Sequence, residues 1–405
     1  MAGRSLWSIT DSSYVTPVPE LSIIIPTLNE AENLPLLLPR IAAAMETVTY
    51  EVILVDDDSR DNTPAVCAEL AHKYPLTLLV RKQPTDGLSG AVLHGMKQAA
   101  GEYLAVMDAD LQHPPEKLPE LLAPLQTNEA DFVLGSRYVE GGGTAEGWTF
   151  YRKINSGLAT LLARPFAGKT TDPMSGFFAL RRSSYAAANR LTPLGYKIGL
   201  ELMCKCRVSR VREIPIHFGL RVRGQSKLSL KQQFRYLEHL SRLYDFTFPR
   251  ASPGIKFLIA TSASWLVGLL TYTLLWATVI PRMAAAGVAY APALVVAAGL
   301  AYLPALAVTT LFHLRYVSTQ RKFIPRPRPW ADFAMISLAE WIVCLSAAAW
   351  AAWRMDESRI EGFLYPFAAA TLARYILRKE FLLDIRGLRR EPRAEELPDA
   401  PGANI

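Results

Sequence analysis

Two acidic clusters follow apolar, β-branched runs, and their spacing suits a divalent cation bound together with a diphosphate. Asp108 and Asp110, in the segment Asp108-Ala109-Asp110-Leu111-Gln112, end one such run, and Asp56-Asp57-Asp58 ends an earlier one. Mg²⁺ and Mn²⁺ take a few hard carboxylate oxygens and leave positions for phosphate oxygens. A lone Asp-x-Asp pair is common in loops, but two acidic clusters at one sheet edge repel each other unless cations or sugar and base donors offset them. Together the clusters indicate a site for a metal and a diphosphate.

Two further polar segments accompany the acidic clusters. Pro26-Thr27-Leu28-Asn29-Glu30 closes the first apolar run. The polar side chains of this segment could bind a base or a ribose. Alternatively, Asn29 could cap the helix that follows. Lys82–Gly90, rich in small residues, predicts a flexible loop near the third run. The sequence has no Walker lysine motif and no G-x-G-x-x-G, which excludes binding of a nucleotide in the P-loop or dinucleotide manner.

The elements that would position these residues alternate along the chain up to Arg250. Apolar runs separated by helical stretches predict an α/β fold with a mostly parallel sheet covered on both faces. Ligands of such sheets bind beyond the carboxyl ends of the strands. The predicted strands are Leu21–Pro26, Glu51–Asp56, Leu76–Val80, Tyr103–Asp108 and Asp131–Gly135, with Gly176–Arg181 and Arg212–Phe218 free to pair differently, and the predicted helices are Glu30–Thr47, Thr63–Lys73, Leu88–Ala100 and Pro115–Gln126.

Beyond Pro249 long apolar segments predict an all-α transmembrane domain. Three of them are long enough to cross a bilayer, which takes roughly 20 helical residues. A fourth, interrupted by Arg374, is either a span or a partly interfacial helix. The segments are Phe257–Ile280, Met283–Phe312, Phe333–Trp353 and Gly362–Leu377.

Basic residues set the orientation that we expect for these spans. They gather after the second and fourth segments, and four spans then place both termini in the cytoplasm by the positive-inside rule. The first 20 residues lack the apolar core of a signal peptide and predict a flexible tail. An integral protein of the cell inner membrane or its equivalent follows, with its α/β domain cytoplasmic. The basic residues are Arg315, Arg321, Lys322, Arg326 and Arg328, then Arg378, Lys379, Arg386, Arg389 and Arg390.

Charged and amphipathic positions in this half allow two structural predictions. Glu340 and Arg374 lie inside apolar segments. We expect them to approach each other because an isolated charge in lipid is expensive, the alternative being that each snorkels to the interface. Leu228–Phe248 mixes aromatic, leucine and basic positions at helical spacing. It predicts a helix on the catalytic core, a helix in the membrane interface, or both at once.

The bulk composition excludes several other classes of protein. The 405 residues include 44 Lys and Arg against 37 Asp and Glu, a net charge of +7. Many of the basic residues flank apolar segments, which is typical of membrane topology and anionic lipid contact and not of nucleic-acid binding. Four scattered cysteines exclude a disulfide scaffold and favour reduced packing residues. His113 and His217 lack a partner pattern for metal or nucleophilic chemistry and predict structural roles.

The motifs taken together resemble those of a known family. IIPTLNE, VDDDSRDNT, MDADLQHPPE, GSRY, FYRK, DPMSGFFALRR and FGLRVRGQSKL occur in this order between about residues 20 and 250. This set is similar to the family 2 glycosyltransferases of GT-A fold, and within them to the polyprenol (dolichol) monophosphate mannose synthases. The membrane half resembles the four-span domain often attached to such enzymes.

The resemblance implies transfer of mannose from GDP-mannose to a polyprenyl or dolichyl phosphate lipid, with Mg²⁺ or Mn²⁺ as cofactor and inversion at the anomeric carbon. It also implies roles for individual positions. Catalysis would involve Asp110, Arg137 and Arg152; the metal would be bound by Asp110 and Gln112. The acceptor phosphate would contact Arg137, Arg152, Ser175 and Lys197. The nucleotide sugar would contact Pro26, Leu28, Glu30, Val55, Asp57, Asp108, Ala109, Asp110, Arg221 and Lys227.

Three positions carry alternatives of their own. Asp172 and Ser175 shape the acceptor pocket or simply cap and turn the chain. Lys197 reaches a phosphate, or it forms an ion pair with Glu201 at helical spacing. The predicted domains are a tail at 1–20, the GT-A domain at 21–227, an interface helix at 228–250, the membrane domain at 251–380 and a cytoplasmic tail at 381–405.

Two other functions compete with mannose transfer. The first is the same chemistry with UDP-glucose as donor. The second is a lipid-linked sugar translocator in the membrane half, with a regulatory soluble half, against which the intact acidic motif argues. The physical chemistry agrees with transfer to a phosphate: a diphosphate leaving group needs a metal and cations, and a phosphate monoester with a second pKa near 6 is an anionic nucleophile at pH 7.

Overall fold

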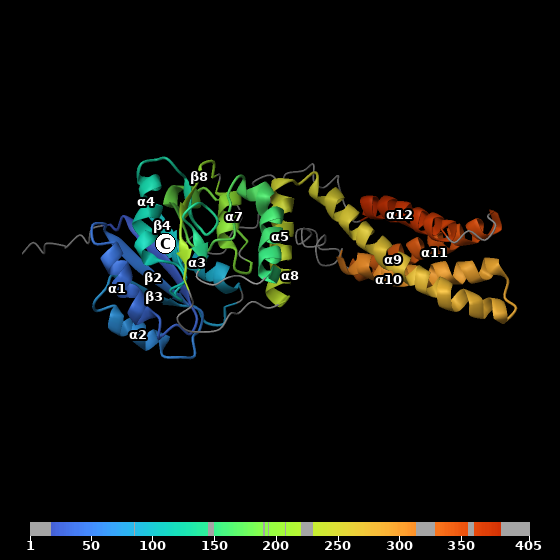
Figure 1. The fold of residues 1–405 in the computed structure, drawn as a ribbon, viewed down its shortest axis with the longest axis horizontal. Coiled ribbons are helices and arrows are strands. Elements are labelled where there is room, and N and C mark those ends of the chain that lie inside the picture. Colours follow the sequence, from blue (N-terminus) through green and yellow to red (C-terminus); the bar gives the residue numbers. More distant parts are fainter. Residues whose placement is uncertain are drawn as a thin grey trace, which may run out of the picture. The chain divides into compact units, whose positions relative to one another are not determined.

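The computed structural model describes residues 18–84, 86–144, 150–188, 191–192, 194–206, 208–219, 230–312, 329–354 and 360–381. It divides into two compact units, Met1–Thr247 and Phe248–Ile405. The first unit holds a β-sheet with helices, and the described part of the second is built from four long helices (Figure 1).

A seven-stranded sheet with the order β3-β2-β1-β4-β7-β5-β8 forms the centre of the first unit. β7 runs antiparallel to both of its neighbours, and every other pairing in this sheet is parallel. The prediction of a mostly parallel α/β sheet is therefore confirmed. The strands are β1 (Leu21–Thr27), β2 (Tyr50–Asp56), β3 (Leu76–Val80), β4 (Tyr103–Val106), β5 (Phe132–Ser136), β7 (Phe178–Arg181) and β8 (Val211–Pro215).

The later strands pair in two ways. Gly176–Arg181, expected to be free to pair differently, becomes the antiparallel β7. Arg212–Phe218, expected as one strand, is divided: β8 joins the main sheet, and β9 (His217–Phe218) pairs in parallel with β6 (Gly143–Thr144) in a separate two-stranded sheet. The break occurs because Ile216, whose side chain is buried, donates its backbone N–H to Ser136 and accepts one from Gly143.

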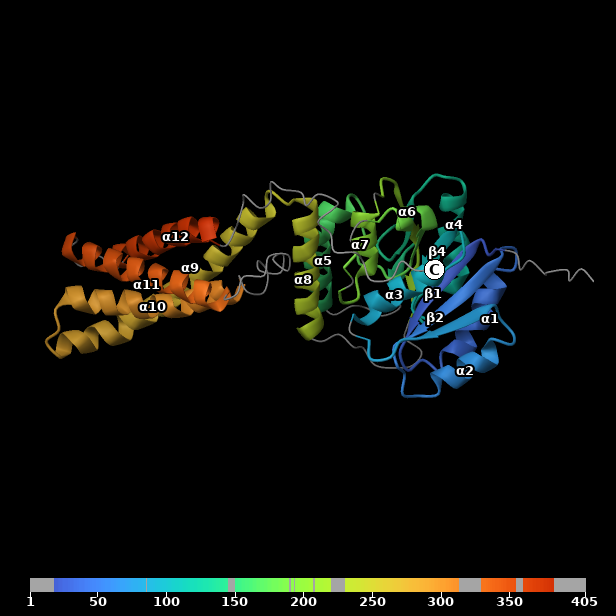
Figure 2. The ribbon, with the colours of Figure 1, turned by 180° about the vertical axis from the view of Figure 1, so that it is seen from behind.

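Helices cover both faces of the sheet and form two apolar cores. The apolar sides of α1 (Leu34–Ala44), α2 (Thr63–Leu70) and α4 (Leu118–Gln126) pack on one face. Those of α3 (Gly87–Gln98), α5 (Phe150–Ala167), α7 (Ile198–Lys205) and α8 (Leu230–Thr247) pack on the other. Figure 2 shows α1 and α2 on one side of β1 and β2, with α3 on the opposite side. The shorter helices are η1 (Pro115–Lys117) and α6 (Arg182–Ala186).

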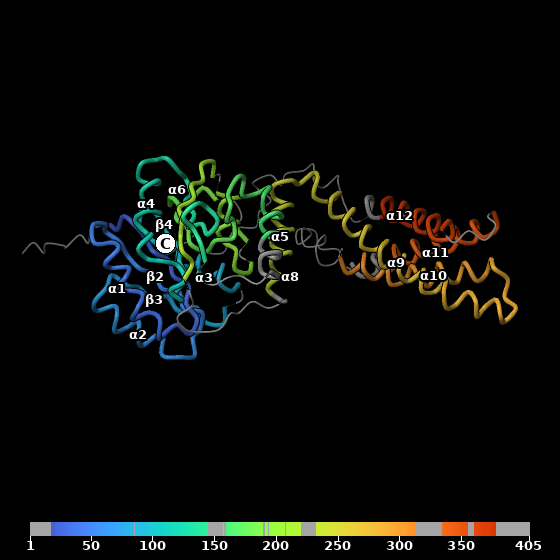
Figure 3. Tube along the Cα trace, viewed as in Figure 1, coloured from blue at the N-terminus to red at the C-terminus, as the bar shows by residue number. Residues whose placement is uncertain are grey.

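The helix before the second unit packs on the rest of the first unit. α8 lies beside α5 (Figure 3), and the Tyr236 hydroxyl donates a 2.8 Å hydrogen bond to the Ala159 carbonyl oxygen of α5. Leu240 and Leu243 of α8 are buried, whereas Phe234 and Leu237 are exposed. The prediction of a surface helix on the catalytic core is confirmed, and its contact with a membrane interface stays a prediction.

The second unit holds α9 (Ser252–Ala285), α10 (Tyr290–Phe312), α11 (Pro329–Arg354) and α12 (Glu361–Phe381). Within the described residues, α9, α10 and residues 334–354 of α11 are long and apolar enough to cross a membrane. α12 is helical as expected but does not belong to that set, so the fourth span stays a prediction. The apolar segment Met283–Phe312 was expected as one span, but its first residues continue α9, and Gly287 turns the chain with a φ of +78°.

A buried ion pair joins three helices of this unit. Arg374 donates from Nε to Glu340 Oε2 over 3.0 Å, and from Nη2 to the Tyr302 hydroxyl oxygen over 2.7 Å. The Tyr302 hydroxyl donates in turn to Glu340 Oε2 over 3.3 Å. Both charged side chains are fully buried, so the prediction that they approach each other is confirmed and the alternative of separate snorkelling is wrong.

Candidate active site

The antiparallel strand β7 brings three chain segments to one sheet edge. β4 and β5 run in the same direction and end at this edge, whereas β7, which lies between them, begins there: Phe178 pairs with both Val106 and Leu134. The residues just before β7 therefore meet the residues that follow β4 and β5. This is the carboxyl edge of the parallel strands, where ligands of such sheets bind.

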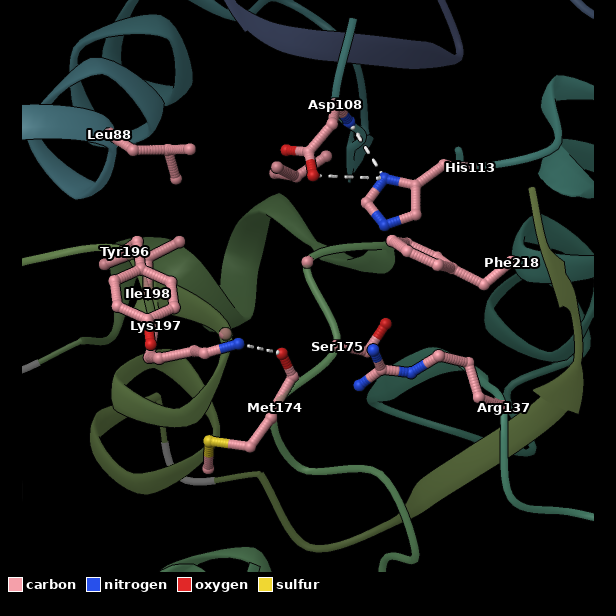
Figure 4. Close-up of a pocket in the computed structure, with 13 residues that line it drawn as sticks. Leu88, Asp108, His113, Arg137, Met174, Ser175, Tyr196, Lys197, Ile198 and Phe218 are labelled. Atoms are coloured by element: carbon pink, nitrogen blue, oxygen red, sulfur yellow. Dashed lines mark hydrogen bonds and ion pairs between the residues drawn. The ribbon is translucent and has the colours of Figure 1, made fainter. Parts of the chain in front are cut away.

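A cavity of about 120 Å³ opens at this edge. Four residues predicted from the sequence line it: Asp108 after β4, Arg137 after β5, Ser175 before β7 and Lys197 before α7. Figure 4 shows the Lys197 amino group and the Arg137 guanidinium on either side of Ser175, with Asp108 and His113 across the cavity. The other lining residues are Leu88, Val106, His113, Met174, Gly176, Tyr196, Ile198, Gly199 and Phe218.

His113 fixes the turn that carries the acidic motif. Its Nδ1 accepts a 2.9 Å hydrogen bond from the Asp108 backbone N–H, and its ring stacks on Phe177 at 5.2 Å. Burial lowers the pKa of His113 to about 4, against a smaller opposing effect of Asp110. The imidazole is therefore neutral at neutral pH, with its proton on Nε2. The predicted structural role is confirmed, and His113 also forms part of the cavity wall.

Arg137 is held by a buried carboxylate. Asp172, which is fully buried, accepts from Arg137 Nε and Nη2 over 2.7 Å each and from its backbone N–H over 3.2 Å. Burial by itself lowers the pKa of Arg137, but the hydrogen bonds and charge of Asp172 raise it overall. A bidentate pair of this kind fixes the plane of the guanidinium. Asp172 therefore shapes the cavity by orienting Arg137.

Lys197 loses its proton more readily than Arg137 does. Its Nζ donates a 2.7 Å hydrogen bond to the Met174 carbonyl oxygen and lies 4.7 Å from the centre of the Tyr196 ring. Burial, with the nearby charge of Arg137, lowers the pKa of Lys197 to about 8. Glu201 forms its 2.7 Å ion pair with Lys205, so the alternative of a Lys197–Glu201 pair is wrong.

The acidic motif after β4 has the chemistry of a divalent-metal site. Asp110 is buried and its Oδ1 accepts from the Gln112 backbone N–H over 3.1 Å, while Gln112 Nε2 donates to the Gly219 carbonyl oxygen over 3.1 Å. In the described part of the chain no three His, Cys, Asp or Glu side chains gather as a metal cage. A few hard oxygens without a cage suit an ion that also binds substrate phosphates, so the donor set fits Mg²⁺ or Mn²⁺.

Three strand ends at this edge adopt a left-handed backbone. Asn29 after β1, Asp58 after β2 and Leu111 after β4 have φ of 58°, 61° and 63°. Asparagine and aspartate tolerate this region, but a leucine there is strained. The Leu111 side chain is packed in the apolar core, which holds the strained turn between Asp110 and Gln112.

Each carboxylate of the second acidic cluster has a protein partner of its own. Asp56 is buried and accepts hydrogen bonds from the backbone and hydroxyl of Ser59. Asp57 Oδ1 lies 3.5 Å from Arg81 Nε, and Asp58 lies 3.4 Å from Lys82 Nζ. Burial raises the pKa of Asp57, and Arg81 opposes this shift. Protein groups thus offset part of the charge of this cluster, and an offset by a bound cation, sugar or base stays a prediction.

The remaining predicted nucleotide contacts lie at the ends of β1 and β2. Leu28 and Glu30 are half-buried after β1, Pro26 is half-buried within it, and Val55 is fully buried in β2. The cap reading of Asn29 is wrong because α1 begins five residues later; instead, Asn29 Oδ1 accepts from the Arg60 backbone N–H.

The side chains of three predicted cations lie outside the described part of the structure. Arg152 lies in α5, but its side chain is outside what the structure describes, and Arg221 and Lys227 lie in the undescribed segment 220–229. Gly219, directly before that segment, is hydrogen-bonded to Gln112 through both its N–H and its carbonyl. The last described residue before that segment, Gly219, therefore lies beside the acidic motif.

Sequence reasoning did not select the aromatic cavity residues Tyr196 and Phe218. Phe218 lies at the start of the FGLRVRGQSKL motif, of which only Arg221 and Lys227 were selected, and Tyr196 directly precedes the selected Lys197. The Lys82–Gly90 loop prediction is wrong from Gly87 onward because α3 begins there, one residue before the predicted helix Leu88–Ala100. Leu88 of α3 forms part of the cavity wall.

Comparison with known proteins gives the class of the molecule: it is a glycosyltransferase. The family described as Glycosyl transferase family 2 matches residues 22–187, and one relative is 46% identical over more than half of the chain. The chain belongs to glycosyl transferase family 2.

Three of the relatives bear the name dolichol-phosphate mannosyltransferase. The protein of Pyrococcus furiosus is 46% identical over 227 residues, which cover 55% of this chain and 63% of that relative. The protein of Mycosarcoma maydis is 40% identical over 61% of this chain and 84% of its own length. The protein of Saccharomyces cerevisiae is 40% identical over 56% and 88%. This chain thus spans less than two thirds of the archaeal relative.

Among solved structures, one similar chain is the glucosyl-3-phosphoglycerate synthase of Mycobacterium tuberculosis in complex with Mn²⁺, UDP and phosphoglyceric acid. Its TM-score to this chain is 0.42. It is 19% identical over 60% of this chain and 84% of that one. The same synthase with phosphoglyceric acid has a TM-score of 0.41 at 19% identity, over 60% of this chain and 85% of that one.

Proposed function

We propose that this glycosyltransferase transfers mannose from GDP-mannose to a polyprenyl, dolichyl-type monophosphate, with inversion at the anomeric carbon. The observation that carries the proposal is that one cavity is lined by the Asp108 carboxylate together with Arg137 and Lys197. A carboxylate beside two cations suits a nucleotide-sugar donor and an anionic acceptor side by side. The 40–46% identity to proteins named dolichol-phosphate mannosyltransferase supports the choice of sugar and lipid.

The donor would bind across the ends of β1, β2 and β4. Asp108 and Ala109 after β4 would contact it, and Asp110 with Gln112 would hold Mg²⁺ or Mn²⁺. When bound, such an ion neutralises the charge that develops on a diphosphate leaving group. The remaining nucleotide contacts would come from Pro26, Leu28, Glu30, Val55 and Asp57, with Arg221 and Lys227 from the undescribed segment. Val55 would contribute through its backbone, because its side chain is fully buried.

The acceptor would bind between Arg137 and Lys197, with Ser175 between them and Arg152 assisting. A phosphate monoester with a second pKa near 6 is largely a dianion at neutral pH, so the residues need only orient it. A phosphate oxygen then forms the new bond to the sugar carbon while the bond from that carbon to the diphosphate breaks. His113, neutral and bonded to the Asp108 backbone, would hold the donor-side turn without adding charge.

The membrane half would keep the enzyme beside its lipid acceptor. Three helices that are long and apolar enough to cross a bilayer follow the catalytic unit. α8 precedes them and exposes Phe234 and Leu237. We propose a cytoplasmic catalytic unit with α8 at the interface, where lipid phosphates lie.

The test uses purified full-length protein, Mg²⁺ or Mn²⁺, a polyprenyl phosphate, and labelled GDP-mannose or UDP-glucose in parallel. Label that enters the organic phase from GDP-mannose alone supports the proposal, and label from UDP-glucose alone overturns the donor. Asp110→Asn should lower the transfer more than 100-fold. The control Glu129→Gln, an exposed carboxylate beside Arg212, should leave it within twofold.

A translocator predicts a different pattern. Flipping of a preformed lipid-linked sugar in liposomes that persists in Asp110→Asn, without any transfer by the wild type, would favour a translocating membrane half.

A further inference from the structure

A buried carboxylate without a role in the proposed chemistry lies one turn beyond the cavity. Glu201 of α7 is fully buried. Its Oε1 accepts from the Thr192 backbone N–H over 2.6 Å and from Lys205 Nζ over 2.7 Å, and its Oε2 lies 3.3 Å from His239 Nε2. Burial raises the pKa of Glu201, but His239, Lys205 and Thr192 overcome this effect and hold it at about 2. Glu201 is therefore ionised at neutral pH.

The hydrogen bond from Thr192 to Glu201 joins two residues that are nine positions apart in the chain. Between these two residues lie Tyr196 and Lys197, both in the cavity wall, and α7 begins immediately after Lys197. A second tie, from the Ser89 backbone N–H of α3 to the Gly195 carbonyl oxygen over 3.1 Å, holds the same stretch. Lys197 therefore lies within a stretch that Glu201 and Ser89 both bond, and small misplacements of a binding group are costly in catalysis.

The third partner of Glu201 comes from a different helix. His239 belongs to α8, and its side chain is 1% exposed. α8 ends at Thr247, and α9, which is long and apolar enough to cross a membrane, begins at Ser252. α8 is therefore the covalent link from the catalytic unit to the first candidate span. His239 thus brings α8 within 3.3 Å of Glu201.

We propose that Glu201 is a positioning residue that transmits the position of α8 to Lys197, so that use of a lipid acceptor depends on the His239–Glu201 contact. The inference rests on the proposed function, in which Lys197 holds the acceptor phosphate. The residues proposed for the nucleotide lie instead at the ends of β1 and β2. Loss of the contact is thus expected to weaken acceptor use and to spare donor binding.

The experiment compares Glu201→Gln and His239→Leu with wild type in the full-length protein in detergent micelles. Both variants should raise the acceptor KM about tenfold while the GDP Kd stays within twofold. His239→Gln, which keeps a polar group beside Glu201 Oε2, should recover part of the loss. The matched control is Tyr244→Phe, which removes the 3.3 Å bond from α8 to the Leu162 carbonyl oxygen of α5 and leaves Glu201 untouched; it should leave the acceptor KM within twofold.

A second measurement is independent of transfer. Reductive ¹³C-methylation labels the lysines, and the NMR signal of Lys197 is identified by its loss in Lys197→Arg. The chemical shift of Lys197 should change in Glu201→Gln and in His239→Leu and should stay unchanged in Tyr244→Phe.

The outcomes separate this inference from the proposed function. An unchanged acceptor KM with an unchanged Lys197 signal overturns the inference. An equal loss of GDP binding and acceptor use with a lower melting temperature also overturns it, because Glu201 is then only structural. If the wild type makes no lipid product, the proposed function fails, and the Lys197 signal alone decides the inference.

Discussion

Removal of Arg374 alone should destabilise the helical unit far more than removal of its whole polar cluster. Arg374→Met leaves the Glu340 carboxylate fully buried without its cation. Breaking a buried pair by removing one partner costs about 3–5 kcal/mol, and a lone charge at mid-membrane depth costs about 3 kcal/mol. The triple variant Arg374→Met, Glu340→Leu, Tyr302→Phe removes both charges and the hydroxyl that bonds them, so it should lose at most about 1 kcal/mol.

The assay follows thermal unfolding of this unit through a buried thiol. Cys344 of α11 is fully buried one turn after Glu340. A thiol-reactive dye therefore reports its exposure once Cys67, Cys204 and Cys206 have been replaced by alanine. For a unit of this size each kcal/mol shifts the melting temperature by about 2–4 °C, so Arg374→Met should lower it by about 6–20 °C and the triple variant by less than about 4 °C.

A matched control and one result decide the reasoning. Arg354→Met removes an exposed arginine at the end of α11 whose guanidinium lies 5.6 Å from the Trp353 ring, and it should shift the melting temperature by less than about 2 °C. A triple variant as unstable as Arg374→Met would refute the argument, because the loss would then come from packing and not from an uncompensated charge.

Three further outcomes are expected in the catalytic unit. Because a lysine is cationic only below its pKa, and that of Lys197 lies at about 8, the acceptor KM should rise as the pH rises through about 8, and Lys197→Met should abolish that rise in steady-state assays. Asp172→Asn should lower transfer at least tenfold while GDP binding, measured by calorimetry, persists, since the amide cannot match the ion pair that orients Arg137. Arg81→Gln should weaken GDP binding about tenfold because it leaves the half-buried Asp57 without its cation, whereas Lys82→Gln, at an exposed pair, should stay within twofold.

The sequence predicted the strands of the sheet well because their signal is local. Leu76–Val80 has the predicted bounds, and the first two strands differ from prediction by one residue at an end. β4 ends earlier than predicted, at Val106. Asp108 therefore belongs to the loop, and its backbone N–H is free of the sheet ladder to bond His113.

The assembly of the cavity could not be read from periodicity, because it depends on where β7 inserts. A run such as Gly176–Arg181 is compatible with either strand direction. Only the antiparallel pairing of Phe178 with Val106 and Leu134 brings Ser175 to the edge where Asp108 and Arg137 lie. The predicted residues thus converge through long-range pairing.

The partners of the two cavity cations assign them different tasks. Arg137 has a buried carboxylate that fixes its orientation, and Asp172 compensates its charge before any substrate binds. Lys197 donates to a backbone carbonyl, which carries no formal charge, and burial has already weakened its hold on the proton. An acceptor dianion would therefore gain more from Lys197, whose charge is uncompensated by its hydrogen-bond partner, while Arg137 supplies a fixed direction. On this reasoning, charge at position 197 governs acceptor affinity and geometry at position 137 governs turnover, so Lys197→Met should act mainly on KM and Asp172→Asn mainly on kcat.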